Sequence, residues 1–289
     1  MLAREEYVEQ AYFFRVLLER LLDRVPIQDL FRSLRDEVLS TTKLPLAIGF
    51  MLDELKHTGT FSAAMERLDH YFRPFQTFLI QSAEREGGRF DLRVAIDLLR
   101  AEAEYLSREP LPQGLFLFQF ESLCRNRLAY DPGLGAIARD PMYDGAWHDW
   151  ILTVRRQIGL VELADLIYVR SDYYVQRARQ QGEEERVAEH RTFFGEKEGR
   201  IALANRRKDP LLLFNALQRH LNYPAVPRPQ PADEAQQLVP QLARRVERLE
   251  MRLKLMEEEQ SNGIDLTKYY LGPGGSSPPP PPPRSDRTQ

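Results

Sequence analysis

Apolar residues recur three and four positions apart through the N-terminal part of the chain, which is the spacing of one buried face on an α-helix. Proline and glycine interrupt this pattern, because proline lacks a backbone N–H and glycine favours helix ends. We therefore predict an all-α fold that begins with a compact bundle of six short helices over residues 5–108. The expected ranges are 5–23, 26–38, 46–55, 63–70, 74–83 and 92–106.

A second helical region is expected over residues 115–221, after a proline-rich connection at 109–114 that we take as a domain boundary. Its helices are predicted at 115–128, 147–159, 161–180 and 211–221, with a short helix between turns at 131–133 and 140–141. The stretch 181–209 is rich in charge, which is typical of solvated helix faces.

The C-terminal part changes character twice. Residues 222–235 contain enough proline to predict an extended linker. Residues 236–261 then place apolar side chains alternately four and three apart, which predicts a short coiled-coil helix that pairs with a second copy or folds back on the bundle. Residues 262–289, with a run of prolines, are expected to be disordered or polyproline in character. The predicted interaction residues of the coiled coil are Leu242, Val246, Leu249, Leu253 and Met256.

The composition of the chain restricts the classes of partner and the cellular compartment that we expect. A net charge of -3 over 289 residues gives no overall electrostatic attraction for nucleic acid or an anionic membrane. The single cysteine, Cys124, excludes an intrachain disulfide and is compatible with a reducing compartment. Residues 1–6 are charged and lack the apolar core of a signal peptide, and no run approaches the roughly 18 apolar residues of a membrane helix. We therefore expect a cytoplasmic protein without an integral membrane segment.

Candidate chemistry is sparse. The five histidines lie far apart and none has metal-ligand spacing with another. The sequence has no phosphate-binding loop, dinucleotide glycine fingerprint or nucleophile elbow. Cys124 lies in an apolar helical pattern, which favours a buried thiol over a nucleophile. Carboxylates at Asp53, Glu54, Glu84 and Glu86 are expected to cap helices or face solvent more than to hold a hard cation. We predict no catalytic residue, cofactor or metal site.

Two alternatives stay open. An enzyme would have its site near Trp147, His148 and Asp149, with Asp144 close by, because a histidine beside a carboxylate can hold a proton near neutral pH. Adjacent helical residues do not face each other, however, so an aromatic anchor with polar neighbours is favoured. A weak nucleic-acid-binding protein would use the basic run at residues 206–208.

Several short segments occur in the order found in a known family. They are Phe13-x-Arg15-x-Leu17 followed by Leu21 and Pro26-Ile27, then Gly59-Thr60-Phe61-Ser62-Ala63-Ala64-Met65, Phe72-Arg73-Pro74 and Ala83-Glu84-Arg85-Glu86-Gly87-Gly88. Over residues 13–106 the chain resembles the F-domain family of type II secretion and type IV pilus platform proteins. Members of that family carry membrane helices that have no counterpart here. Arg24 also stands where the family has glycine.

The expected function is that of a non-enzymatic protein-interaction adaptor or assembly factor. The predicted coiled coil implies a homo-oligomer, and the resemblance implies protein partners from a secretion or pilus-type apparatus. Nucleic acid is not an expected partner.

Overall fold

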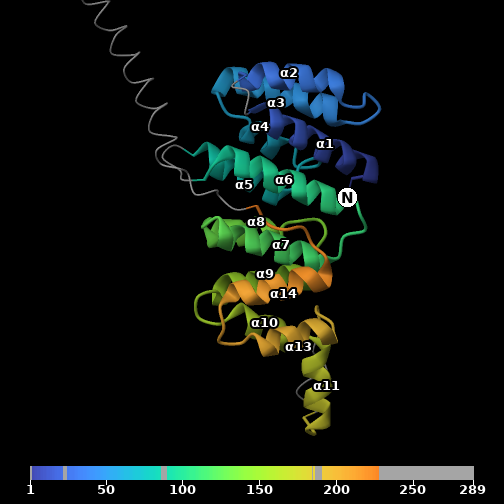
Figure 1. Ribbon diagram of the computed structural model, residues 1–289, viewed down its shortest axis with the longest axis vertical. Coiled ribbons are helices and arrows are strands. Elements are labelled where there is room, and N and C mark those ends of the chain that lie inside the picture. The colour runs from blue at the N-terminus through green and yellow to red at the C-terminus, as the bar shows by residue number, and fades with distance from the viewer. Residues whose placement is uncertain (1, 22–24, 86–89, 184, 186–190, 228–289) are drawn as a thin grey trace, which may run out of the picture. The chain divides into compact units, whose positions relative to one another are not determined.

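The computed structural model describes residues 2–21, 25–85, 90–183, 185 and 191–227, and the segment Met1–Gln230 forms one compact unit. Every regular element in these residues is a helix, so the predicted all-α class is confirmed (Figure 1). The expected coiled coil, the rest of the linker after residue 227 and the C-terminal tail lie outside the described residues. The helices are α1 (Arg4–Leu21), α2 (Ile27–Glu37), α3 (Leu44–Thr58), α4 (Ser62–Arg67), α5 (Pro74–Glu84), α6 (Leu92–Leu106), α7 (Pro112–Arg125), α8 (Tyr130–Ala138), α9 (Gly145–Gln157), α10 (Leu163–Val169), α11 (Asp172–Gln180), α13 (Glu196–Ala204) and α14 (Pro210–Leu221).

Within this unit the helices stack in two columns (Figure 1). One column runs α2, α1, α6, α7, α14 and α13, and the other runs α3, α4, α5, α8 and α9, with successive members in contact. Helix α10 packs against both α13 and α14. Helix α14 therefore returns to lie between α7 and α13, although it follows α13 in the chain.

Local chemistry sets the helix ends. Asp91, Asp144 and Asp209 each accept a backbone N–H from the first turn of the helix that follows, at 2.8, 3.0 and 2.8 Å. Such N-caps satisfy donors that the helix itself cannot pair. Helix α3 ends at Gly59, whose φ of 77° is favourable only for a residue without a Cβ.

The connection between α6 and α7 is residues 107–111, so residues 112–114 of the expected linker belong to α7, and the helices on either side of the connection are in direct contact. Helix α6 packs against α7, and α5 packs against α8. The buried core is correspondingly continuous from Phe13 in α1 to Phe214 in α14. The described residues of the expected linker, 222–227, form no regular element, and Tyr223 and Val226 are buried against the helices.

The helix predicted over residues 161–180 is wrong, because two helices, α10 and α11, occupy that stretch. Ser171 separates them: its buried hydroxyl donates to the Tyr168 carbonyl at 2.6 Å and accepts the Tyr174 N–H. The next residue, Asp172, gives its backbone N–H to the carbonyl of Phe194 at 2.9 Å. A polar side chain that competes for backbone groups thus ends one helix and starts the next.

The expectation of solvated helix faces throughout residues 181–209 is also wrong. Phe193 and Phe194 are buried there, and Phe193 lies 4.7 Å from Trp147 between ring centroids. Helix α13 follows, with Ala202 fully buried. Both tryptophans of α9 join this aromatic cluster, in which the Trp150 and Phe116 centroids are 4.8 Å apart. The aromatic-anchor interpretation of Trp147 agrees with this packing.

Candidate functional site

The residues named for the enzyme alternative do not converge. His148 Nδ1 lies 2.8 Å from the carbonyl oxygen of Ala138, so the ring is tied to the end of α8. Asp144 caps α9 through the Trp147 N–H and pairs with Arg191 at 2.5 Å, which lowers its pKa. Asp149 is exposed on the helix surface. These three polar side chains therefore have separate structural surroundings.

Of the carboxylates considered for a hard cation, Asp53, Glu54 and Glu84 have structural partners, and Glu86 lies outside the described residues. Glu84 accepts the backbone N–H groups of Phe61 and Ser62 at 2.8 and 3.1 Å, and so caps α4. Glu54 pairs with Arg67 at 3.2 Å. Within the described residues, no group of three or more His, Cys, Asp or Glu side chains is arranged to hold a metal ion.

Sequence reasoning missed a buried ionic cluster in the middle of the unit. Arg73 donates to Asp140 Oδ1 at 2.6 Å and to the Tyr7 hydroxyl oxygen at 2.8 Å. Gln119 Nε2 donates to Glu102 Oε1 at 2.7 Å and to Asp140 Oδ2 at 3.4 Å. These residues belong to, or lie next to, helices of both columns, so the hydrogen bonds of the cluster connect the two columns.

The cluster holds two carboxylates, Glu102 and Asp140, against one guanidinium. Glu102 is fully buried, and burial with the nearby charge of Asp140 raises its pKa to about 7, although Arg73 opposes the shift. Tyr143 completes the cluster by donating its hydroxyl to Gln119 Oε1 at 2.9 Å. Every residue of this cluster is buried, and its hydrogen bonds join different helices.

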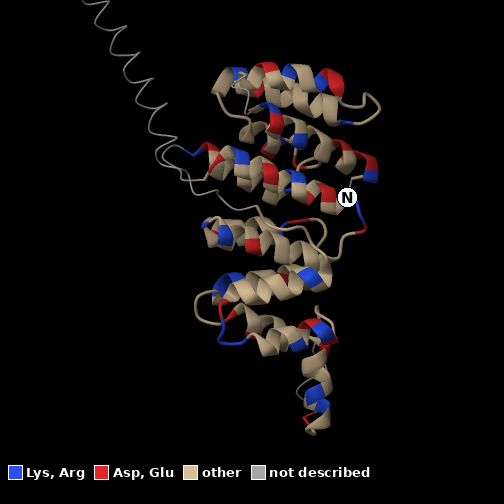
Figure 2. Cartoon of the chain, in the orientation of Figure 1, with Lys and Arg blue, Asp and Glu red and all other residues tan. Residues whose placement is uncertain are grey.

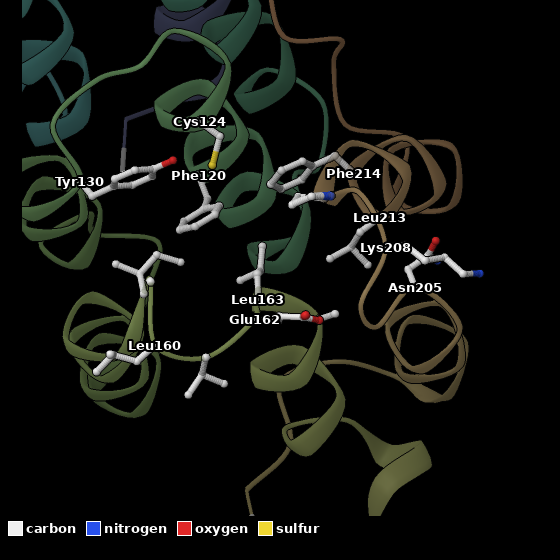
Figure 3. A pocket seen from close by; sticks show the side chains of 15 residues that line it. Phe120, Cys124, Tyr130, Leu160, Glu162, Leu163, Asn205, Lys208, Leu213 and Phe214 are labelled. Carbon is white, nitrogen blue, oxygen red and sulfur yellow. The ribbon is translucent and has the colours of Figure 1, made fainter.

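A cavity with mostly apolar walls lies where α14 returns to α7. It has a volume of about 530 Å³ and is shown in Figure 3. Helix α7 contributes Phe120 and Cys124, and α14 contributes Leu213 and Phe214. The connection between α9 and α10, at 158–162, forms another side of the cavity. We call this cavity the α7–α14 pocket.

Apolar and polar side chains are segregated in the α7–α14 pocket. Rings and aliphatic groups occupy most of the wall, whereas Glu162, Asn205 and Lys208 gather along one edge (Figure 3). Leu160 and Val161 line the pocket and are nevertheless 86% and 36% exposed. Their connection turns at Gly159, where φ is 88°.

Cys124 does not supply a nucleophile to this pocket. Burial raises the pKa of its thiol to about 11, and a hydrogen bond with the Tyr130 hydroxyl only partly offsets that effect. The thiol is therefore protonated at neutral pH. No family model, curated protein or solved structure matches this chain. What the α7–α14 pocket offers chemically is contact area for an apolar group, with hydrogen-bonding and charged side chains at one edge.

The pocket forms because α14 packs against α7, which is distant from it in the sequence, and no local sequence pattern predicts that contact. Gly159 followed by two apolar residues at a turn was the one sequence signal for it, because apolar side chains at an exposed turn are unusual. The basic run at 206–208 was noticed, and the structure places it in the loop that leads into α14. That loop is blue in Figure 2. Among the described residues, no helix has both the length and the apolar character needed to cross a bilayer.

Proposed function

We propose that this chain is a non-enzymatic binding protein that takes an apolar group of its partner into the α7–α14 pocket. The observation that best supports this proposal is a cavity of about 530 Å³, which has apolar walls and the exposed side chains of Leu160 and Val161 at its mouth. Ligand sites commonly have volumes of about 300–1,000 Å³ and mostly apolar linings. An adaptor or assembly factor of cytoplasmic location fits this chemistry.

The energy available at the mouth supports binding. Covering a fully exposed leucine side chain contributes about 1.5–3 kcal/mol. Leu160 is 86% exposed, so most of that contribution is still available to a partner. Leu160 and Val161 adjoin the apolar wall of the pocket, and a contiguous apolar surface marks a binding site more often than scattered single residues do.

The class of partner follows from the resemblance of residues 13–106 to the F-domain family. We extend the proposal to protein partners of a secretion or pilus-type apparatus. Self-association through residues 236–261 belongs to the same proposal and depends on the heptad spacing of that segment.

A neutral fluorescent apolar probe, N-phenyl-1-naphthylamine, tests the binding role on the full chain. Leu160→Ser should weaken probe binding by about fivefold to tenfold, because it removes about 1 kcal/mol of apolar contact. Leu46→Ser is the matched control, since Leu46 is 79% exposed on α3 and does not line the pocket. Equal probe affinity in the parent chain and both variants contradicts the proposal.

A filling variant gives a second measure. Ala164 lines the pocket from α10, so Ala164→Phe should reduce probe binding without touching the exposed mouth. Circular dichroism and thermal unfolding establish that each variant is folded before affinities are compared.

A further inference from the structure

The charged side chains at and near the polar edge of the α7–α14 pocket differ in the partners that they have. Glu162 accepts the backbone N–H of Arg207 at 2.8 Å, and Asp209 accepts that of Leu211 at 2.8 Å. Both carboxylates thus have donors from the backbone. Lys208, by contrast, makes no ion pair with a carboxylate of the described residues. These neutral donors fix the two carboxylates in place without cancelling their negative charge, whereas the positive charge of Lys208 is not committed to an ion pair within the described residues.

Arg206, the cation next to this edge, already has partners. Arg206 pairs with Asp165 of α10, and its guanidinium lies over the Tyr168 ring at 5.7 Å from the centroid. Lys208 is exposed at the rim, and Figure 3 shows its nitrogen directed away from the aromatic wall. A lysine ammonium on a flexible four-carbon stem can turn towards an anion at the rim.

Asn205 adds a second donor at the same place. Its side-chain Nδ2 donates to the Ile201 carbonyl at 2.8 Å, and an amide nitrogen has a second hydrogen. Asn205 and Lys208 lie together at the polar edge of the pocket (Figure 3). An anionic head at this edge can therefore meet an amide donor and an ammonium while its apolar part lies against the walls.

We propose that the α7–α14 pocket binds an aliphatic monocarboxylate of the fatty-acid class. This inference rests on the proposed function, because it names the apolar group that the pocket takes. The chain of the ligand packs against Phe120, Leu163 and Phe214, and its carboxylate meets Lys208 and Asn205. A single negative charge suits the edge better than two, because Glu162 lies on the same edge and repels a second charge.

The test compares ligands that share a chain and differ in the head group. Isothermal titration calorimetry of the full chain with decanoate, decan-1-ol and decylamine, each below its aggregation concentration, measures the three affinities at low ionic strength. Decanoate should bind about fivefold more tightly than the alcohol, the size expected for one partly screened ion pair. It should also bind more tightly than the amine, whose ammonium is repelled by Lys208 and attracted by Glu162. Raising the salt concentration should reduce the advantage of decanoate.

Two variants assign that advantage to the polar edge. Lys208→Gln should bring decanoate to the affinity of the alcohol and leave the alcohol unchanged. Lys197→Gln on α13 is the matched control, because Lys197 is also exposed and does not line the pocket. A preference for decanoate that survives Lys208→Gln overturns the inference.

The outcomes separate this inference from the proposed function. Equal affinity of all three ligands, competed by the neutral probe, rejects the carboxylate preference and leaves the binding role intact. Failure of the probe and of all three ligands to bind rejects both. Binding of phosphatidylglycerol vesicles without binding of decanoate rejects the inference in favour of a membrane surface, and retention of an acidic amphipathic peptide alone rejects it in favour of a protein segment.

Discussion

Replacing Glu102 by glutamine should remove a pH dependence of stability that the buried cluster creates. Glu102 Oε1 accepts one hydrogen bond from Gln119, whereas Oε2 accepts none from the described residues. The groups that act on this carboxyl are Arg73, Asp140, the amides of Gln119 and Gln76, and the nearby Tyr143. Glutamine has nearly the same shape and no titration, so Glu102→Gln isolates the charge.

The sign of this pH dependence follows from the direction in which folding shifts the pKa of Glu102. The pKa of Glu102 is raised from 4.5 to about 7, so the folded state holds its proton more tightly than the unfolded state does. The contribution of Glu102 to the free energy of unfolding is therefore most favourable below about pH 4.5 and falls as pH rises to about 7. At about 1.4 kcal/mol for each pH unit, this carboxyl lowers stability by about 3 kcal/mol across that window. Above it, the loss is complete.

Urea unfolding of the parent chain and the variant, followed by tryptophan fluorescence, measures this effect between pH 4.5 and pH 8. Trp147 and Trp150 are both buried, so unfolding changes their environment. The difference between the two unfolding free energies cancels the titration of all shared groups. It should shift by about 3 kcal/mol in favour of the variant as pH rises.

A matched variant controls for the loss of a carboxylate as such. Glu104→Gln lies on the same helix, where Glu104 is partly exposed and pairs with Arg100 at 2.7 Å. That variant should run nearly parallel to the parent chain across the same pH range. If Glu102→Gln also runs parallel, the buried carboxyl is ionised at little cost and the reasoning fails.

Three further predictions concern other parts of the chain. Gly199→Ala should lower the free energy of unfolding by about 1–3 kcal/mol in urea titrations, because the new Cβ would lie 2.2 Å from Ser171 Oγ. Gly145→Ala, where a Cβ meets nothing within 4 Å, should not show that loss, and equal effects would count against the packing argument. Cys124 should react slowly with a thiol reagent at pH 8 in the folded chain and rapidly in urea, because burial raises its pKa to about 11. Rapid reaction of the folded chain would contradict this. Removing all residues after Pro231 should reduce the oligomeric state seen by sedimentation velocity, because it deletes the predicted heptads. An unchanged mass per particle would end the self-association proposal.

The sequence predicted most of the helices because their signals are local. Spacing of apolar residues places a helix face, and Pro26, Gly59 and Pro74 interrupt the chain near the observed ends of helices. The single helix expected at 161–180 failed because Ser171 bonds to neighbouring backbone groups, and because the distant Phe194 carbonyl accepts the N–H of Asp172. That partner lies in a charge-rich stretch whose average composition concealed two buried rings.

The features that define the sites were not accessible from the sequence, because they join distant residues. Arg73 and Asp140 are 67 positions apart, and neither stands in a pattern that marks it as buried. The α7–α14 pocket brings Phe120 and Phe214 together, with ring centroids 6.2 Å apart. Periodicity identifies which side chains are apolar, but it does not specify which helix they meet.

The return of α14 to α7 has a consequence for biosynthesis. Residues 210–221 emerge from the ribosome after every other helix named above, yet they cover side chains of α7 that were made much earlier. Until then, the aromatic surface around Phe120 is uncovered and available to chaperones or to other nascent chains. A premature stop before Pro210 would therefore yield a product that has the helices from α1 to α13 and keeps the apolar surface of α7 exposed, so it should be prone to aggregation.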